Sequence, residues 1–137
     1  MTWLLDTNML VYALKRQGGV RERLNETALR GDRLTMSAVT MAELLYGAER
    51  SARRDENRRT ILTKLKRIDV IPFGQGAADH YAKIKALLAA AGLPRPRLDL
   101  LIAAAALDLG ARLVSHDDDL HDVIPDLVVE DWYIEGK

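Results

Sequence analysis

The chain has 137 residues, of which 48% are hydrophobic and 29% are charged. These values are typical of a globular protein that buries a core without disulfides or structural zinc, and we expect one domain over residues 1–137. The absence of cysteine excludes disulfides and thiolate zinc sites, and it suits the reducing cytoplasm, the expected location. The formal net charge is zero, so bulk charge gives no indication of a nucleic-acid partner.

Membrane insertion is not expected. The longest apolar stretch, Leu100 to Leu107, is far shorter than the roughly 20 residues that cross a bilayer. The N-terminal residues reach a carboxylate at Asp6, without the apolar segment of a secretion signal.

Five short apolar runs predict buried strands, separated by longer stretches with helical spacing: Trp3–Leu5, Leu34–Met36, Val70–Phe73, Arg112–Ser115 and Leu127–Val129. This alternation predicts an α/β fold with a central parallel sheet of about five strands and helices on both faces. In such sheets, ligand sites form where the C-terminal ends of the strands meet the following loops. Carboxylates at those positions are therefore the first candidates for a site.

Asp6 is the first such carboxylate. It follows the run Trp3–Leu5 and precedes a stretch with helical spacing, so it lies at a strand end that opens a helix. Aspartate is among the best helix N-caps, and position alone does not separate a capping role from a catalytic one.

Glu43 lies within a helical pattern and shares its face with uncharged neighbours: Val39, Thr40, Tyr46 and Gly47. A carboxylate in these surroundings is less typical of a merely solubilising residue. The alternative is a glutamate near the first helical turn, stabilised there by the helix dipole or by a capping box.

A basic stretch follows between residues 50 and 67. Its cations are Arg50, Arg53, Arg54, Arg58, Arg59, Lys64, Lys66 and Arg67, and Asp55 and Glu56 are its acids. Residues 117 to 135, in contrast, contain eight acids and no lysine or arginine. The basic stretch is either a solvated helix face or a contact surface for phosphates.

Asp99 precedes an apolar helical run and shares a face with Ile102, Ala103 and Ala106. It should therefore face the surface on which the helix packs, whereas Asp108 should point into solvent. An N-cap after the proline-containing loop is the alternative role for Asp99.

Asp117 comes directly after the fourth predicted strand and its flanking His116. It is followed by Asp118 and Asp119, and three consecutive acids are usually an exposed turn. Asp117 nevertheless has the same topological place as Asp6, at the C-terminal end of a strand.

Carboxylates gathered at one sheet edge repel each other. Two unit charges about 4 Å apart repel by roughly 4 kcal/mol at an effective dielectric of 20, so such a cluster takes up protons or binds a cation. Oxygen ligands favour Mg²⁺, for which Mn²⁺ can substitute. These ions suit phosphodiester hydrolysis, a chemistry that requires none of His80, His116 and His121.

Four segments resemble, in order and spacing, the VapC branch of the PIN-domain family: Leu4–Leu10, Ser37–Ala48, Asp99–Leu107 and Leu113–Leu120. The likeness extends to the closing Leu127–Trp132. It implies a three-layer α/β/α fold and a Mg²⁺-dependent endoribonuclease that is the toxic component of a type II toxin–antitoxin system. It also implies an RNA substrate, a cognate antitoxin and a homodimer.

Matched residue by residue, the resemblance implies that Asp6, Glu43, Asp99 and Asp117 are the catalytic, metal-binding carboxylates. Asn8 and Ser115 would hold these carboxylates by hydrogen bonds. Asp119 falls where the family often has an acid, so the division of labour between Asp117 and Asp119 stays open. Threonine is frequent at the position of Ser115 and phenylalanine at that of Leu120. Beside such a site, Arg50, Arg53 and Arg54 become candidates for RNA binding.

Two other classes compete with this interpretation. A phosphatase of the haloacid-dehalogenase type also has an aspartate after the first strand, but it needs a second one two residues later, where this chain has Asn8. A receiver domain needs an earlier acidic pair and a lysine after a late strand, where this chain has Ser115 and His116. A catalytically inactive RNA-binding protein of the same fold is the remaining alternative.

Overall fold

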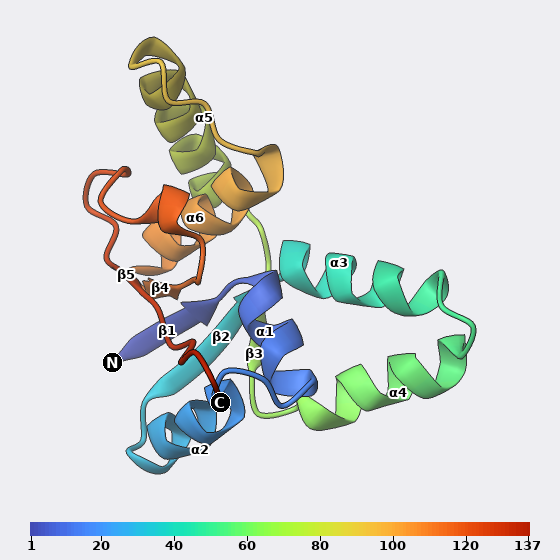
Figure 1. Ribbon diagram of the computed structural model, residues 1–137. Helices are drawn as coiled ribbons and strands as arrows, with labels where there is room; N and C mark the ends of the chain where they lie inside the picture. Colours follow the sequence, from blue (N-terminus) through green and yellow to red (C-terminus); the bar gives the residue numbers. More distant parts are fainter.

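A computed structural model describes residues 1–137, and it contains one parallel five-stranded sheet between two groups of helices (Figure 1). The strand order is β3-β2-β1-β4-β5, and every neighbouring pair is parallel. The strands are β1 (Thr2–Leu5), β2 (Arg33–Ser37), β3 (Asp69–Ile71), β4 (Arg112–Val114) and β5 (Val129–Glu130). The predicted α/β class and its parallel sheet are confirmed.

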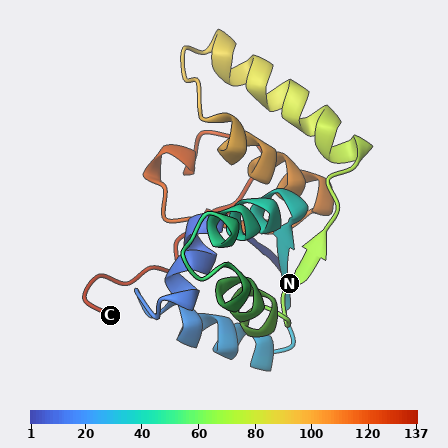
Figure 2. The ribbon, with the colours of Figure 1, turned by 90° about the vertical axis from the view of Figure 1, so that its right-hand side faces the viewer.

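The helices form two groups that are consecutive in the chain (Figures 1 and 2). The first group contains α1 (Thr7–Leu14), α2 (Val20–Leu29), α3 (Ala38–Glu49) and α4 (Arg54–Lys64). The second contains α5 (Gln75–Ala90), α6 (Arg97–Leu109) and the short 3₁₀ helix η1 (Asp118–Leu120). No helix combines the length and the apolar character needed to cross a membrane.

The central strand β1 contributes to a separate core on each face of the sheet. Trp3 and Leu5 pack into the core that includes residues of α1 to α4, whereas Leu4 packs into the core with α5 and α6. Leu113 and Val114 of β4 divide between the two cores in the same way. Side chains alternate along a strand, so an all-apolar strand is stable only when both faces are covered.

Three elements begin with a side-chain cap at or beyond a strand end. Asp6 accepts a 2.8 Å hydrogen bond from the Met9 N–H at the start of α1. Ser37 caps α3 through the Val39 N–H, and Asp117 caps η1. Capping thus fixes polar side chains at the C-terminal edge of the sheet.

The C-terminal segment packs against the first half of the chain. Trp132 is only 2% exposed, and its ring meets that of Trp3 edge to face at a centroid distance of 5.2 Å. The Gly18 N–H donates to the Lys137 carbonyl (2.9 Å), and the Ile134 N–H donates to the Gly18 carbonyl (2.8 Å). Gly18 has a φ of +69°, and a Cβ there would overlap the Tyr133 ring. Trp132 is therefore part of the folded core, and two backbone hydrogen bonds tie the exposed residues after Tyr133 to Gly18.

All five strands differ from their predicted ranges at one end or both, and β3 and β5 differ most. β3 ends at Ile71 instead of Phe73, because Pro72 has no N–H to donate to a ladder. β5 is Val129–Glu130 instead of Leu127–Val129, because the Leu127 N–H is used in a turn with the Ile124 carbonyl. Leu127 is buried nonetheless, so its apolar character reflects packing on the core and not strand pairing.

Candidate active site

Asp6 is a buried carboxylate at the C-terminal end of β1, with 8% of its surface exposed. Its N–H donates to the Val114 carbonyl of β4 at 3.1 Å, which ties this strand end to its neighbour. Burial raises the pKa of Asp6 to about 6, and repulsion from Asp99 and Asp117 adds to the rise, against hydrogen bonds from Ser115 and the Met9 N–H. Asp6 is both the N-cap of α1 and a carboxylate in an electronegative environment.

Asp117 lies just beyond the adjacent strand. Because Leu5 of β1 is in register with Val114 of β4, the residues that follow the two strands emerge at the same edge. The Asp117 N–H donates to Ser115 Oγ at 3.1 Å, and Asp117 Oδ1 accepts from the Asp119 N–H at 2.9 Å. Ser115 is fully buried and interacts with both Asp6 and Asp117.

Asp99 comes from the first turn of α6, which begins at Arg97 after an N-cap at Pro96. The alternative that Asp99 itself caps the helix is therefore wrong. Burial is the main cause that raises the pKa of Asp99, and repulsion from Asp117, Glu43 and Asp119 raises it further. Asp108 of the same helix is exposed, as predicted.

Glu43 lies in the second turn of α3, which is capped by Ser37. The alternative role as a capping-box residue is therefore wrong. Its Oε1 accepts a 2.6 Å hydrogen bond from the Thr7 hydroxyl, which also lies 3.4 Å from the hydroxyl oxygen of Thr40. Thr7 was not among the residues singled out from the sequence; its only signal was its place directly after Asp6. The predicted partner Asn8 is exposed on the first turn of α1.

Electrostatic coupling relates the four predicted carboxylates, since Asp99 is perturbed by Asp117 and Glu43 and Asp6 by Asp99 and Asp117. No three of the acidic or histidine side chains are close enough to form a complete metal site. The available donors are carboxylate oxygens, which suit Mg²⁺ or Mn²⁺ by chemical type. The donor set therefore fits a hard divalent cation, although its side chains are not gathered around one point.

Asp119 is exposed, and repulsion from its carboxylate contributes to the raised pKa of Asp99. Its carbonyl accepts a 2.8 Å hydrogen bond from Arg95 Nε, which joins η1 to the loop before α6. His116 Nδ1 lies 2.8 Å from Asp131 Oδ2, and this hydrogen bond raises the pKa of His116. A histidine beside the acidic edge is thus already engaged by the C-terminal segment.

The three arginines predicted to bind RNA are not equivalent. Arg50 lines a hollow of about 610 Å³ that also contains Thr7 and Glu43, and its guanidinium lies 5.5 Å from the Tyr46 ring centroid. Arg53 and Arg54 lie at the connection between α3 and α4, which projects away from the sheet (Figure 1). Arg53 pairs with Glu56 at 3.6 Å. Arg50 alone of the three shares a hollow with a predicted catalytic carboxylate.

Known proteins match this chain over nearly its full length. The sequence model of the PIN domain matches residues 3–124. The chain is 35% identical to the tRNA(fMet)-specific endonuclease VapC of Shigella flexneri and 36% identical to Ribonuclease VapC1 of Haemophilus influenzae, each over 96% of this chain and 98% of the relative. The crystal structure of VapBC2 from Rickettsia felis bound to a promoter DNA fragment matches with a TM-score of 0.89 at 30% identity, covering 96% of this chain and 99% of that one.

These matches agree with the fold of the chain. The chain therefore belongs to the PIN-domain family and, within it, to the VapC proteins.

Proposed function

We propose that the chain is the toxic component of a type II toxin–antitoxin system, an endoribonuclease that hydrolyses RNA phosphodiester bonds with the help of Mg²⁺. The observation that carries this proposal is the buried Asp6, whose pKa is raised to about 6 at a strand end with other carboxylates nearby. A buried acid with a perturbed pKa at such an edge is typical of a functional site. The 35% identity to an endonuclease that is named as tRNA-specific indicates RNA as the substrate.

We assign Asp6, Asp99, Glu43 and Asp117 as the residues that hold the cation, with Asp6 and Asp99 as direct ligands. A bound Mg²⁺ or Mn²⁺ supplies charge neutralisation at the phosphate and activation of the attacking water. Ser115 and Thr7 orient Asp6 and Glu43 through their hydroxyls. Capping hydrogen bonds hold the side chains of Asp6 and Asp117, whereas no side-chain hydrogen bond holds the half-buried Asp99.

A cognate antitoxin and a second copy of the chain are the proposed protein partners. The Rickettsia felis match is a VapBC2 structure on promoter DNA, in which the relative of this chain is part of the complex. Exposed apolar side chains border the hollow that contains Glu43, with Tyr46 64% and Leu98 43% exposed. We also infer that residues 1–137 form a single PIN domain, since the C-terminal Trp132 completes the core around Trp3.

The test of this function is cleavage of a mixed pool of structured and single-stranded RNAs, with Mg²⁺ or with EDTA. We expect cleavage that needs the metal and is abolished by Asp6→Asn and by Asp99→Asn. Asp108→Asn is the matched control, because it removes an exposed carboxylate from the same helix as Asp99. Full activity of both Asp6→Asn and Asp99→Asn would overturn the site. RNA binding without cleavage in any metal would favour an inactive RNA-binding protein instead.

A further inference from the structure

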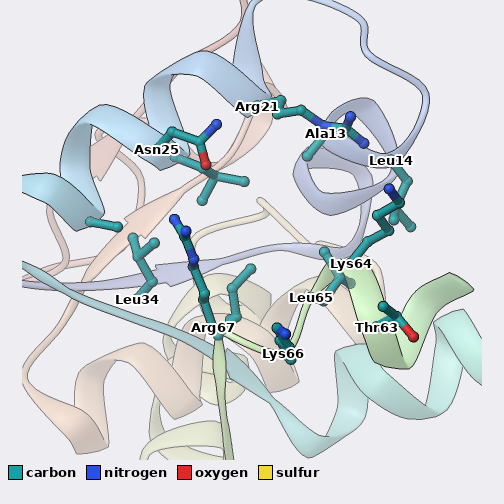
Figure 3. Close-up of a pocket in the computed structure, with 13 residues that line it drawn as sticks. Ala13, Leu14, Arg21, Asn25, Leu34, Thr63, Lys64, Leu65, Lys66 and Arg67 are labelled. Carbon is teal, nitrogen blue, oxygen red and sulfur yellow. The ribbon is translucent and has the colours of Figure 1, made fainter.

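Another hollow lies away from the carboxylate edge. It has a volume of about 240 Å³ and is lined by the end of α1, by α2, by Leu34 of β2 and by residues 63 to 68 (Figure 3). Its basic side chains are Arg21 from α2 and Lys64, Lys66 and Arg67 from the end of α4 and the segment after it. We call this hollow the basic pocket.

The positive charge of the basic pocket is not compensated within the chain. Its lining contains no aspartate or glutamate, and none of its four cations forms an ion pair. Four of the twelve arginines outside the basic pocket form ion pairs: Arg23, Arg30, Arg33 and Arg53. Uncompensated cations that converge on one hollow attract a polyanion more strongly than the same charges spread over a surface.

The floor of the basic pocket is buried and apolar. Leu24, Leu34, Leu65 and Ile68 are all buried in the core that α1 to α4 share with the sheet. The buried Leu65 anchors to this core the segment that carries Lys64, Lys66 and Arg67. In Figure 3, Arg67 extends across the hollow towards Asn25 of α2, while Lys64 points towards Leu14.

A further hollow, called the groove, lies along α1. This groove has a volume of about 330 Å³ and is lined by residues from Thr7 and Glu43 at one end to Leu14 and Lys15 at the other. Leu14 lines both the groove and the basic pocket. The intervening helix α1 has eight residues, a length of about 12 Å. An extended anionic chain can therefore lie against both places at once.

We propose that the basic pocket is an exosite for the RNA substrate, which binds backbone phosphates of nucleotides that lie away from the cleaved bond. This inference rests on the proposed ribonuclease function. It assigns phosphate contacts to Arg21, Lys64, Lys66 and Arg67, in place of Arg53 and Arg54 at the other end of α4. Lysine and arginine contacts to phosphate position a nucleic acid without reading its sequence, so the exosite contributes affinity and orientation and not base choice.

The test compares two double variants that remove the same charge from the same basic stretch. Lys66→Gln with Arg67→Gln removes cations of the basic pocket, and Arg58→Gln with Arg59→Gln removes exposed cations of α4 outside it. Each pair is placed in the Asp6→Asn chain, and binding of a fluorescently labelled structured RNA is measured by anisotropy from 50 to 300 mM salt. Circular dichroism checks the fold of each variant.

We expect the Kd of the Lys66/Arg67 pair to rise on the order of tenfold near physiological salt, with its salt slope reduced by roughly 1.4 to 1.8, the value for two lost phosphate contacts. The Arg58/Arg59 pair should change little. Equal effects of the two pairs, or none from Lys66/Arg67, would overturn the exosite. Loss of antitoxin binding with unchanged RNA binding would also overturn it, in favour of a protein-docking surface.

A second measurement separates this inference from the proposed function. If the otherwise unmodified chain cleaves RNA but the Lys66/Arg67 pair has an unchanged KM, the exosite fails and the ribonuclease function stands. If the unmodified chain cleaves no RNA, the proposed function fails, whatever the binding data show. A raised KM with a nearly unchanged kcat supports the exosite, because distant phosphate contacts bind ground state and transition state alike.

Discussion

The Thr7 hydroxyl donates a 2.6 Å hydrogen bond to Glu43 Oε1 and thereby joins the first turn of α1 to the middle of α3. Asp6, the preceding residue, is held by the Met9 N–H of the same turn. Two carboxylates from different parts of the sequence are thus oriented by one helical turn. The start of α1 is therefore the structural centre of the candidate active site.

Thr7→Ala should lower the rate of RNA cleavage by about tenfold, because a hydrogen bond to a charged group contributes roughly 1.5 to 3 kcal/mol and Glu43 loses its orientation. Thr7→Ser retains the hydroxyl and should recover most of the rate. Thr7→Val retains the shape without the hydroxyl and should behave like alanine. Single-turnover cleavage measures all three, and a valine variant as active as the serine variant would show that the hydroxyl has no role.

Asp6→Asn should abolish cleavage while stabilising the metal-free fold. The difference between the ordinary pKa of 3.8 and about 6 corresponds to roughly 3 kcal/mol against the charged form at neutral pH. Asparagine removes the charge and still caps α1. Asp6→Ala removes the charge and also the N-cap, and the loss of the cap costs about 1 kcal/mol. The alanine variant should therefore be stabilised less than the asparagine variant. Urea unfolding in EDTA compares the three chains, and an asparagine variant less stable than the parent would contradict the burial argument.

The metal-free stability should depend on pH through Asp6. Below pH 3.8 the Asp6 carboxyl is protonated in both the folded and the unfolded chain, so burying it costs the fold no stability. As the pH rises to about 6, the unfolded chain ionises first, and roughly 3 kcal/mol is lost over the whole interval. The difference in unfolding free energy between Asp6→Asn and the parent should therefore grow between pH 4.5 and pH 7.5. A constant difference would indicate an unshifted pKa.

Trp132→Ala should destabilise the fold by about 3 to 5 kcal/mol, the usual cost of removing a large buried aromatic side chain. The indole packs on Trp3, donates to Glu130 Oε1 at 3.1 Å and lies under the Arg23 guanidinium. Trp132→Phe retains the ring packing and should cost clearly less. Chemical denaturation of the three chains measures their free energies of unfolding. An alanine variant within 1 kcal/mol of the parent would show that Trp132 does not contribute to the core.

The α/β class and the layer arrangement follow from short-range features of this sequence, whereas the strand order β3-β2-β1-β4-β5 was not predicted. The strands are read from apolar runs such as Trp3–Leu5, and the helices between them require parallel pairing. The same reasoning places Asp6 and Asp117 at one edge. It does not predict the Thr7 contact with Glu43, because a hydrogen bond between two helices depends on how they pack and not on the spacing of either one.

The basic stretch of residues 50 to 67 shows a second limit of prediction from sequence. In the sequence, Arg53 and Lys66 belong to one run of positive charge, yet α4 separates them by its full length and pairs Arg53 with Glu56. Arg21, distant in the sequence, joins the second half of the run in the basic pocket. A count of charges along the chain cannot reveal this division, since it arises from the tertiary neighbours of each cation.

The central position of β1 also sets the moment at which the edge is assembled during synthesis. Trp3 of β1 pairs with Arg112 of β4. The first strand to emerge from the ribosome therefore cannot complete its pairing until the fourth strand has been synthesised. A nascent chain that ends before β4 contains Asp6 and Glu43 but lacks the strand that places Asp117 at the same edge of the sheet as Asp6. Translation itself therefore delays the appearance of the complete carboxylate edge until most of the polypeptide has been made.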